Sequence, residues 1–192
     1  IDNLVAAKIN DVVSIYQLAQ KYRTPMFSAS SLRYTDKAQK ARALAFGKVL
    51  GASTFSPAKT EATHTDLFWY GIHGVEMLYT IMGTGCVSVT QTATVDTDIV
   101  TGIWKDGRIG VFRGTRNGKH DYGGIVHAEK ATVHIDRYDG YEPLLKEIIR
   151  FFETGTPPVS AAETIEIYAF MDAAAKSKIS RGQPIALKTP VL

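Results

Sequence analysis

The chain has 192 residues, of which 45% are hydrophobic and 10% aromatic, and its 22 basic and 19 acidic residues leave a net charge of +3. This composition supports a buried core and excludes disorder as the main state, and the scattered charges do not by themselves imply nucleic acid. The single cysteine excludes a disulfide framework, and no apolar run approaches the roughly 20 residues of a membrane helix.

The first 34 residues are typical of one half of an α/β unit. Asn10 or Asp11 is a suitable helix cap, apolar residues at helical spacing follow from Val12 to Ala19, and the segment 22–25 interrupts the pattern. The short apolar segment Met26–Ser30 then predicts a strand. A helix followed by a buried strand indicates the last turn of a doubly wound sheet, so we expect residues 1–34 to be the end of such a domain.

Two more helices and a strand are expected before the middle of the chain. The first helix starts at Thr35 or Asp36 and ends near Phe46-Gly47, and the strand covers 49–55. The second helix runs from Thr65 or Asp66 to Met82, where Gly83 supplies a left-handed cap.

The middle of the sequence is predicted to be β-structure. Strands are expected at 87–94, 99–104, 109–115, 123–129 and 132–135. Asp106-Gly107 and Asn117-Gly118 are two-residue hairpin signals, which favour an antiparallel meander. With the strand at 49–55, the sheet has about six strands.

Two helices close the chain. The first has an apolar stripe from Tyr141 to Phe152 and ends at the Gly155–Pro158 turn, and Ser160 with Glu163 forms a capping box for the second. The predicted fold class is therefore α+β (α/β): a large open, mainly antiparallel sheet with helices on one face, over residues 35–192. Because the other face of such a sheet is bare, we expect a homo-oligomer to cover it.

His73 and Glu76 form the sharpest candidate for chemistry. Their i, i+3 spacing places an imidazole and a carboxylate on one helix side, where they can exchange a proton with a hydroxyl near neutral pH. A surface ion pair or a satisfied, partly buried histidine is the alternative. The five histidines never lie three to five residues apart on one helix, so no metal site is expected.

A ligand-binding position is expected just past the predicted strand at 26–30. Ser30, Ser31, Arg33 and Tyr34 lie there, where open α/β sheets place ligands. Arg33 is suited to an anionic or polyhydroxylated ligand, and a salt bridge between elements is the alternative.

A basic region also lies along the predicted strand 109–115 and its flanks. Strand alternation sends Arg113 to one face and Arg108 and Arg116 to the other, so no continuous basic stripe with Lys119 forms. Nucleic acid is therefore an unlikely partner, kept as a minor option.

The segments FWYGIHGVEMLYTIMG and YEPLLKEIIRFFETGTPPVSAAETIEIYAFMDAAAKSKISRGQPI, with Asp2-Asn3-Leu4, resemble the Gfo/Idh/MocA family. This family comprises NAD(P)-dependent sugar and inositol oxidoreductases with a dinucleotide-binding (Rossmann) domain followed by a substrate domain. The resemblance covers nearly the whole chain. It implies that residues 1–34 are a Rossmann remnant and that residues 35–192 bind substrate and form oligomers.

The resemblance also implies site residues. The family's Glu-Lys-Pro motif corresponds to Asp2-Asn3-Leu4, which places Asn3 at the cofactor without the lysine's ammonium group. In the family's D-x-G-x-H-x-x-D motif, Trp69 replaces the first aspartate, whereas His73 is kept and Glu76 keeps the acid. His73 with Glu76 is thus expected to be catalytic.

The implied function is that of a fragment of an NAD(P)-dependent oxidoreductase acting on a sugar or polyol. Arg33, Tyr34, Trp69 and Tyr70 are expected to bind the substrate. NAD or NADP is expected in the full-length protein and no cofactor for this chain alone, because the family's glycine-rich turn lies upstream of residue 1.

The alternative function is a catalytically degraded carbohydrate-binding or assembly module of the same fold. No membrane partner is expected. The compartment stays open: cytoplasmic, or exported if a signal precedes residue 1.

Overall fold

The burial of side chains alternates along most strands of one seven-stranded sheet. In β3, Asp98, Val100 and Gly102 are buried and the residues between them are more exposed, as a sheet with one covered face requires. The computed structural model describes residues 5–190 and 192. Its strands are β1 (Val49–Pro57), β2 (Cys86–Ala93), β3 (Thr97–Trp104), β4 (Ile109–Thr115), β5 (Gly123–Ala128), β6 (Thr132–Ile135) and β7 (Ile185–Ala186).

The sheet order is β6-β5-β1-β4-β3-β2-β7, so β1 lies in the middle of strands that follow it in the chain. Ser53 of β1 is opposite Val111 of β4 in a parallel pair and opposite Ile125 of β5 in an antiparallel pair. The sheet is mainly antiparallel, as predicted. The predicted meander is confirmed for β2, β3 and β4 and for the pair β5 and β6, but it is wrong between β4 and β5, which are not neighbours.

The two hairpin signals have different outcomes. Gly107 (φ 85°) forms the tight turn between β3 and β4, which pair along their whole length. Gly118 (φ 72°) also turns the chain, but it opens a connection that crosses from β4 to the far side of β1. A turn signal fixes the local backbone and not the strand that the chain joins next.

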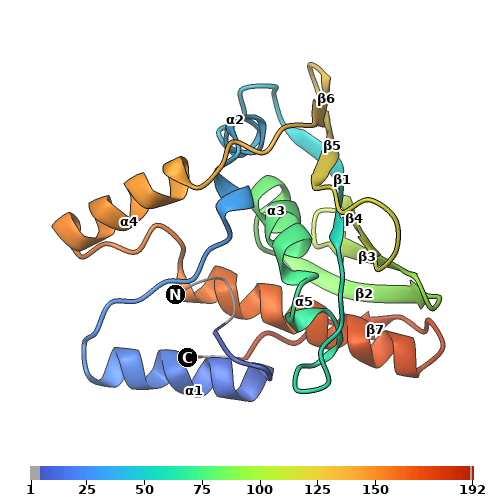
Figure 1. The fold of residues 1–192 in the computed structure, drawn as a ribbon, viewed down its shortest axis with the longest axis horizontal. Coiled ribbons are helices and arrows are strands. Elements are labelled where there is room, and N and C mark those ends of the chain that lie inside the picture. Colours follow the sequence, from blue (N-terminus) through green and yellow to red (C-terminus); the bar gives the residue numbers. More distant parts are fainter. Residues whose placement is uncertain (1–4, 191) are drawn as a thin grey trace.

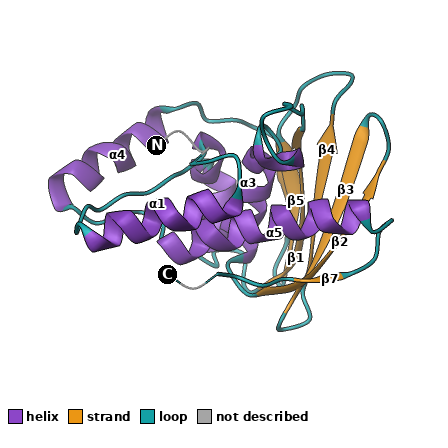
Figure 2. Cartoon of the chain, turned by 90° about the horizontal axis from the view of Figure 1, so that it is seen from below, coloured by secondary structure: helices purple, strands orange, loops and turns teal. Residues whose placement is uncertain are grey.

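All helices lie on one side of the sheet, which leaves the other face uncovered (Figure 2). The helix α3 packs on β1 and β4, α5 packs on β2, and α4 projects away from the sheet (Figure 1). No helix within the described residues is long and apolar enough to cross a bilayer. The helices are α1 (Ile9–Lys21), the 3₁₀ turn η1 (Ser31–Tyr34), α2 (Asp36–Arg42), η2 (Asp66–Phe68), α3 (Ile72–Met82), α4 (Glu142–Thr154) and α5 (Ala161–Ile179).

The segment between α1 and η1 differs from the predicted strand. Only Ala29 makes a β-bridge, and Met26–Ser30 is otherwise extended without a ladder. Phe27 and Ala29 are nevertheless buried, in a small cluster with Leu144 of α4 and Val159. The apolar pattern therefore marked burial against helix side chains rather than strand pairing.

The start of α1 and its packing also differ from expectation. The helix begins at Ile9 with Lys8 at its N-cap, so neither Asn10 nor Asp11 caps it. Val12 and Tyr16 belong to the same buried cluster as α3 and α5. The domain boundary at residue 34 stays a prediction.

The ends of two other predicted helices are shifted. The chain leaves α2 after Arg42, because Leu44 adopts a positive φ of 56°. The predicted helix from Thr65 or Asp66 to Met82 is divided into η2 and α3, and Gly83 (φ 71°) ends α3 as expected.

The predicted apolar stripe of α4 is only partly buried. Leu144 is buried, whereas Leu145, Ile149 and Phe152 are 54%, 57% and 79% exposed. At the start of α5, by contrast, the Ser160 hydroxyl accepts the Glu163 N–H at 3.1 Å, which confirms Ser160 as the N-cap. The Glu163 carboxylate pairs with Arg33 and Arg42, so the second half of the predicted capping box does not form.

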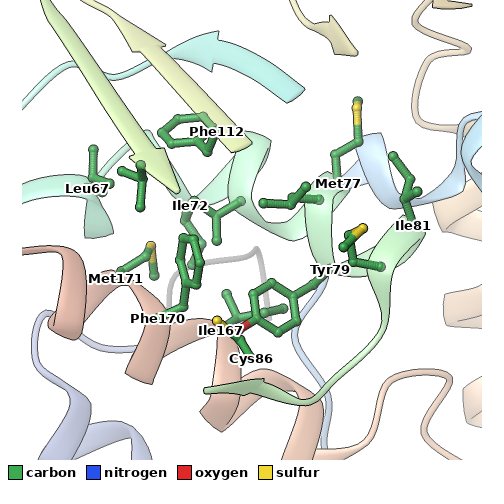
Figure 3. Close-up of a cluster of buried hydrophobic side chains, with 14 of the residues drawn as sticks. Leu67, Ile72, Met77, Tyr79, Ile81, Cys86, Phe112, Ile167, Phe170 and Met171 are labelled. Carbon is green, nitrogen blue, oxygen red and sulfur yellow. The ribbon is translucent and has the colours of Figure 1, made fainter. Parts of the chain in front are cut away.

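The core lies between the sheet and the two helices α3 and α5. Figure 3 shows Ile72 and Tyr79 of α3, Phe112 of β4 and Phe170 of α5 in one cluster. The Tyr79 and Phe170 rings meet edge to face with centroids 5.6 Å apart. These contacts fix the height of α3 above the sheet.

Gly74 allows α3 to lie directly on the sheet. A Cβ atom at this position would be 2.4 Å from the Phe112 ring and 2.8 Å from the Ser56 hydroxyl. The Thr54 hydroxyl also donates to the Gly74 carbonyl at 2.9 Å. Because His73 precedes this contact, its position depends on the close approach of helix and sheet.

Gly74→Ala is expected to lower the free energy of unfolding by about 1–3 kcal/mol, because the added methyl group has no room beside Phe112. Urea denaturation measures the change. Ser14→Ala on the exposed side of α1 is the control and should stay within about 0.5 kcal/mol. Equal stability of the two variants would contradict the close contact.

Candidate active site

A cavity of about 100 Å³ opens beside the first turn of α3. It lies where η1, α3 and the loops before β5 and α4 meet. Four tyrosines and one histidine give it an amphipathic wall. The cavity is lined by Ser30, Ser31, Leu32, Tyr70, His73, Tyr122, Tyr138 and Tyr141.

His73 is held by Ser30 in this wall. The Ser30 hydroxyl and the His73 Nδ1 atom are 3.0 Å apart, and the same hydroxyl accepts the Leu32 N–H at 3.2 Å. Ser30 is only 2% exposed, so its position is fixed. A group that engages one ring nitrogen sets the orientation of the ring and leaves proton exchange to the other nitrogen.

Glu76 contacts groups other than those predicted. Its Oε2 accepts the Ser30 N–H at 2.9 Å and its Oε1 accepts the Arg33 Nε–H at 2.6 Å. Ser30, rather than Glu76, is the partner of His73 Nδ1. The i, i+3 spacing places both side chains on one side of α3, but the buried guanidinium group draws the carboxylate toward η1.

Arg33 joins two carboxylates inside the protein. It is 2% exposed, and its Nη1 donates to Glu163 Oε1 of α5 at 2.7 Å. Arg42 of α2 also donates to Glu163, at 3.2 Å to each oxygen. Arg33 therefore forms the salt bridge between elements that was the alternative to a ligand contact. Its side chain does not line the cavity beside His73.

Burial and charge act in opposite directions on these acids. Burial raises the pKa of Glu76, and Arg33 and the Ser30 N–H only partly oppose this. Burial also raises the pKa of Glu163, but Arg33 and Arg42 outweigh this effect and hold the pKa below the ordinary value. The two carboxylates in turn raise the pKa of Arg33, despite its burial.

The other predicted substrate-binding residues are dispersed. Tyr70 lines the cavity, with its ring edge to face with His73 at 5.2 Å between centroids, and its hydroxyl accepts from Tyr122 at 3.1 Å. Trp69 is 41% exposed and its ring packs against His64. Tyr34 packs with the cluster around Phe27. Asn3, the predicted cofactor contact, lies outside the described residues.

Sequence reasoning missed three tyrosines of the cavity. Tyr122 precedes β5, Tyr138 follows β6, and Tyr141, which was assigned to an apolar helix stripe, is the N-cap residue of α4. The Tyr138 hydroxyl is 2.8 Å from that of Ser31. The close spacing of Tyr138 and Tyr141 was the available signal, but only Tyr141 was interpreted, as part of the apolar stripe.

The predicted basic region makes local pairs. Arg108 pairs with Asp106 at 2.8 Å, and Arg116 pairs with Asp98. Arg113 lies exposed on β4, apart from both. In the part of the chain that the structure describes, no group of three or more metal-ligating side chains is found.

Comparisons with known proteins show what the fold resembles. No family model matches the sequence, and no curated protein matches it. Solved structures do match the fold, although at 10–20% identity the likeness shows the fold alone.

One similar structure is that of a candidate myo-inositol dehydrogenase from Sinorhizobium meliloti, with a TM-score of 0.82, 16% identity, and coverage of 97% of this chain and 73% of that chain. An NAD-binding oxidoreductase from Klebsiella pneumoniae has a TM-score of 0.82 at 12% identity, with coverage of 98% and 73%. The scyllo-inositol dehydrogenase of Lactobacillus casei, solved with NAD(H) and scyllo-inositol, has a TM-score of 0.79 at 10% identity, with coverage of 97% and 72%.

Arg33→Met is expected to lower the free energy of unfolding by about 3–5 kcal/mol, because it leaves two buried carboxylates without their shared cation. Chemical denaturation at neutral pH measures the loss. The control is Lys37→Met, which removes an exposed pair with Asp136 and should cost at most about 1 kcal/mol. Similar losses in both variants would mean that Arg33 does not hold the site together.

Proposed function

We propose that this chain, which has the fold of the C-terminal part of the Gfo/Idh/MocA oxidoreductases, supplies the substrate-binding and oligomerisation domain of an NAD(P)-dependent oxidoreductase acting on a sugar or polyol. The observation that carries this proposal is His73, held at Nδ1 by Ser30 in a tyrosine-lined cavity. Its support is the likeness to dehydrogenases, one of them solved with scyllo-inositol.

In this proposal His73 exchanges the proton of a substrate hydroxyl group. Ser30 engages Nδ1, so we assign the exchange to Nε2. Glu76 touches the backbone N–H of Ser30 and is a positioning residue that acts through it. Neutral imidazole accepts a proton near neutral pH, which suits the oxidation of an alcohol.

The cavity suits part of a polyhydroxylated ring. Its volume of about 100 Å³ is below the roughly 300–1,000 Å³ of complete ligand sites, so it accommodates the reacting edge of a ligand. Tyrosine rings pack against C–H faces, and the hydroxyls of Tyr70, Tyr138 and Ser31 exchange hydrogen bonds with ligand hydroxyls.

The described residues do not form a dinucleotide site by themselves. Such a site needs a glycine-rich turn before a helix N-terminus, and no G-x-G-x-x-G run occurs in this sequence. In the proposal NAD or NADP is therefore held by another part of the full-length protein. No step of the proton exchange above depends on how it is held.

One observation favours the alternative of a catalytically degraded carbohydrate-binding or assembly module. Trp69 occupies the place of the family's first aspartate, and its half-exposed ring packs on His64 and does not line the cavity. An indole supplies no carboxylate to orient an imidazole. In this case the tyrosine-lined cavity binds a sugar without turnover.

The test uses the full-length protein with NAD or NADP and a panel of inositols and sugars. Wild type is expected to bind the nicotinamide cofactor and to reduce it with one of the polyols. His73→Ala should lower kcat/KM about 10²–10⁴-fold with an unchanged unfolding curve. His134→Ala on β6, an exposed histidine, is the matched control and should leave turnover unchanged.

Two results would contradict this proposal. If the full-length protein binds neither NAD nor NADP, it is not an NAD(P)-dependent oxidoreductase. Cofactor and sugar binding with no turnover, equal in wild type and His73→Ala, supports the binding module.

The proposal includes a homo-oligomer through the uncovered sheet face. This face lies opposite the helices (Figure 2). Strand alternation places a set of aliphatic and aromatic side chains on it. Val111 and Ile125 lie on either side of Ser53 on neighbouring strands, and Arg113 lies on the same face opposite Phe55 and Ile99, so the apolar side chains surround two polar ones. Its members are Phe55, Ile99, Ile103, Ile109, Val111 and Ile125.

Val111→Lys is expected to convert the oligomer to a monomer in sedimentation equilibrium, because it places a charge in the middle of this face. Leu18→Lys on the exposed side of α1 introduces the same charge outside the face and should leave the mass unchanged. A monomeric wild type would refute the oligomer and leave the active-site proposal intact.

A further inference from the structure

A second cavity, of about 430 Å³, lies on the other side of Arg33. It opens between η1, α2 and α4, and no residue lines both this cavity and the one beside His73. The proposed function makes no use of it. Its charged and hydrogen-bonding wall consists mainly of Arg33, Tyr34, Arg42, Lys146, Glu147 and Arg150.

This wall is rich in cations. Arg42 comes from α2, and Lys146 and Arg150 lie one turn apart on α4. Lys146 also pairs with Glu142 along the helix at 2.8 Å, whereas Arg150 has no salt bridge with any described residue. Glu147 is the single carboxylate in the wall.

Two buried donors in the wall lack acceptors. The Arg33 side chain is 2% exposed; its Nε and Nη1 atoms are paired, but its Nη2 atom is buried with no hydrogen-bond partner among the described residues. The Tyr34 hydroxyl is buried without a partner in the same way. Buried unpaired donors are rare and costly, and an ordered water or a bound ion is among the groups that satisfy them in native proteins.

The carboxylates Glu76 and Glu163 do not supply an acceptor for Arg33 Nη2. They contact the Nε and Nη1 atoms of Arg33, and neither residue lines the second cavity. The cations that line the cavity are therefore Arg33, whose Nη2 is unpaired within residues 5–190, Arg42, which pairs with Glu163, and the two α4 residues Lys146 and Arg150. A guanidinium group with an unpaired N–H, surrounded by further cations, suits an oxyanion.

We propose that this cavity binds a phosphate group, either inorganic phosphate or the phosphate of a monoester. Arg33 Nη2 and the Tyr34 hydroxyl donate to it, and Arg42, Lys146 and Arg150 surround it. The donors lie on three separate elements, which suits the several oxygens of a tetrahedral phosphate better than the two oxygens of a planar carboxylate. Glu147 disfavours the bound anion.

The test is calorimetric titration of the full-length protein with inorganic phosphate and, separately, with glucose 6-phosphate at low ionic strength. Arg150→Gln and Lys146→Gln should each weaken binding about tenfold, which corresponds to the loss of one charged contact. Glu147→Gln should tighten binding. Lys119→Gln is the control, because Lys119 is also an exposed lysine paired with an acidic neighbour, Asp121, and lies outside the cavity.

Tyr34→Phe gives a second test that does not endanger folding. The variant removes only a hydroxyl that has no partner among residues 5–190, so the unfolding curve should not move to lower denaturant, while phosphate binding weakens several-fold. Unchanged phosphate affinity in Tyr34→Phe, Arg150→Gln and Glu147→Gln would identify an adventitious ion only and overturn the site.

The two titrants distinguish the source of the phosphate group. Tighter binding of glucose 6-phosphate, with the same dependence on Arg150, assigns the site to a phosphomonoester, and binding of inorganic phosphate alone assigns it to the free ion. Binding of neither titrant overturns the proposal. Turnover by the His73 site is measured independently, so failure here leaves the proposed function unaffected.

Discussion

The buried pairing of Arg33 with Glu76 and Glu163 is the constraint on which the rest of the site depends. One guanidinium group links η1 to α3 and, through Glu163, to α5. Glu76 then holds the Ser30 N–H, and the Ser30 hydroxyl holds His73. The imidazole is thus positioned through a chain of contacts that begins at a residue outside its own cavity. Buried charges of this kind are tolerated only when each has its partner.

Much of the fold was predictable where the signal is local. The start of α5 follows from Ser160 and Glu163, and the β3–β4 hairpin follows from Asp106-Gly107. The position of β1 was not predictable, because its neighbours β4 and β5 lie about 60 and 70 residues later in the chain. A run of alternating residues predicts that a strand has a buried face, and it does not identify the strand beside it.

The candidate site also contains residues that the sequence identified and residues that it did not. His73 was identified from its spacing to Glu76 and from the family resemblance, and Tyr70 from the neighbouring motif. Ser30 as the partner of His73 could not be found, because the two residues are 43 positions apart and meet only when η1 lies against α3. Arg33 was assigned to a ligand because a lone arginine after a strand carries no sign of carboxylates elsewhere in the chain.

The central place of β1 also affects the order in which the sheet assembles. When β1 leaves the ribosome, neither of its hydrogen-bonding neighbours has been synthesised, so both of its edges are open. The β3–β4 hairpin forms from adjacent segments, whereas closure around β1 requires loops of more than 50 residues. Long-range pairing of this kind slows folding, and the nascent chain carries an unsatisfied strand until β5 arrives.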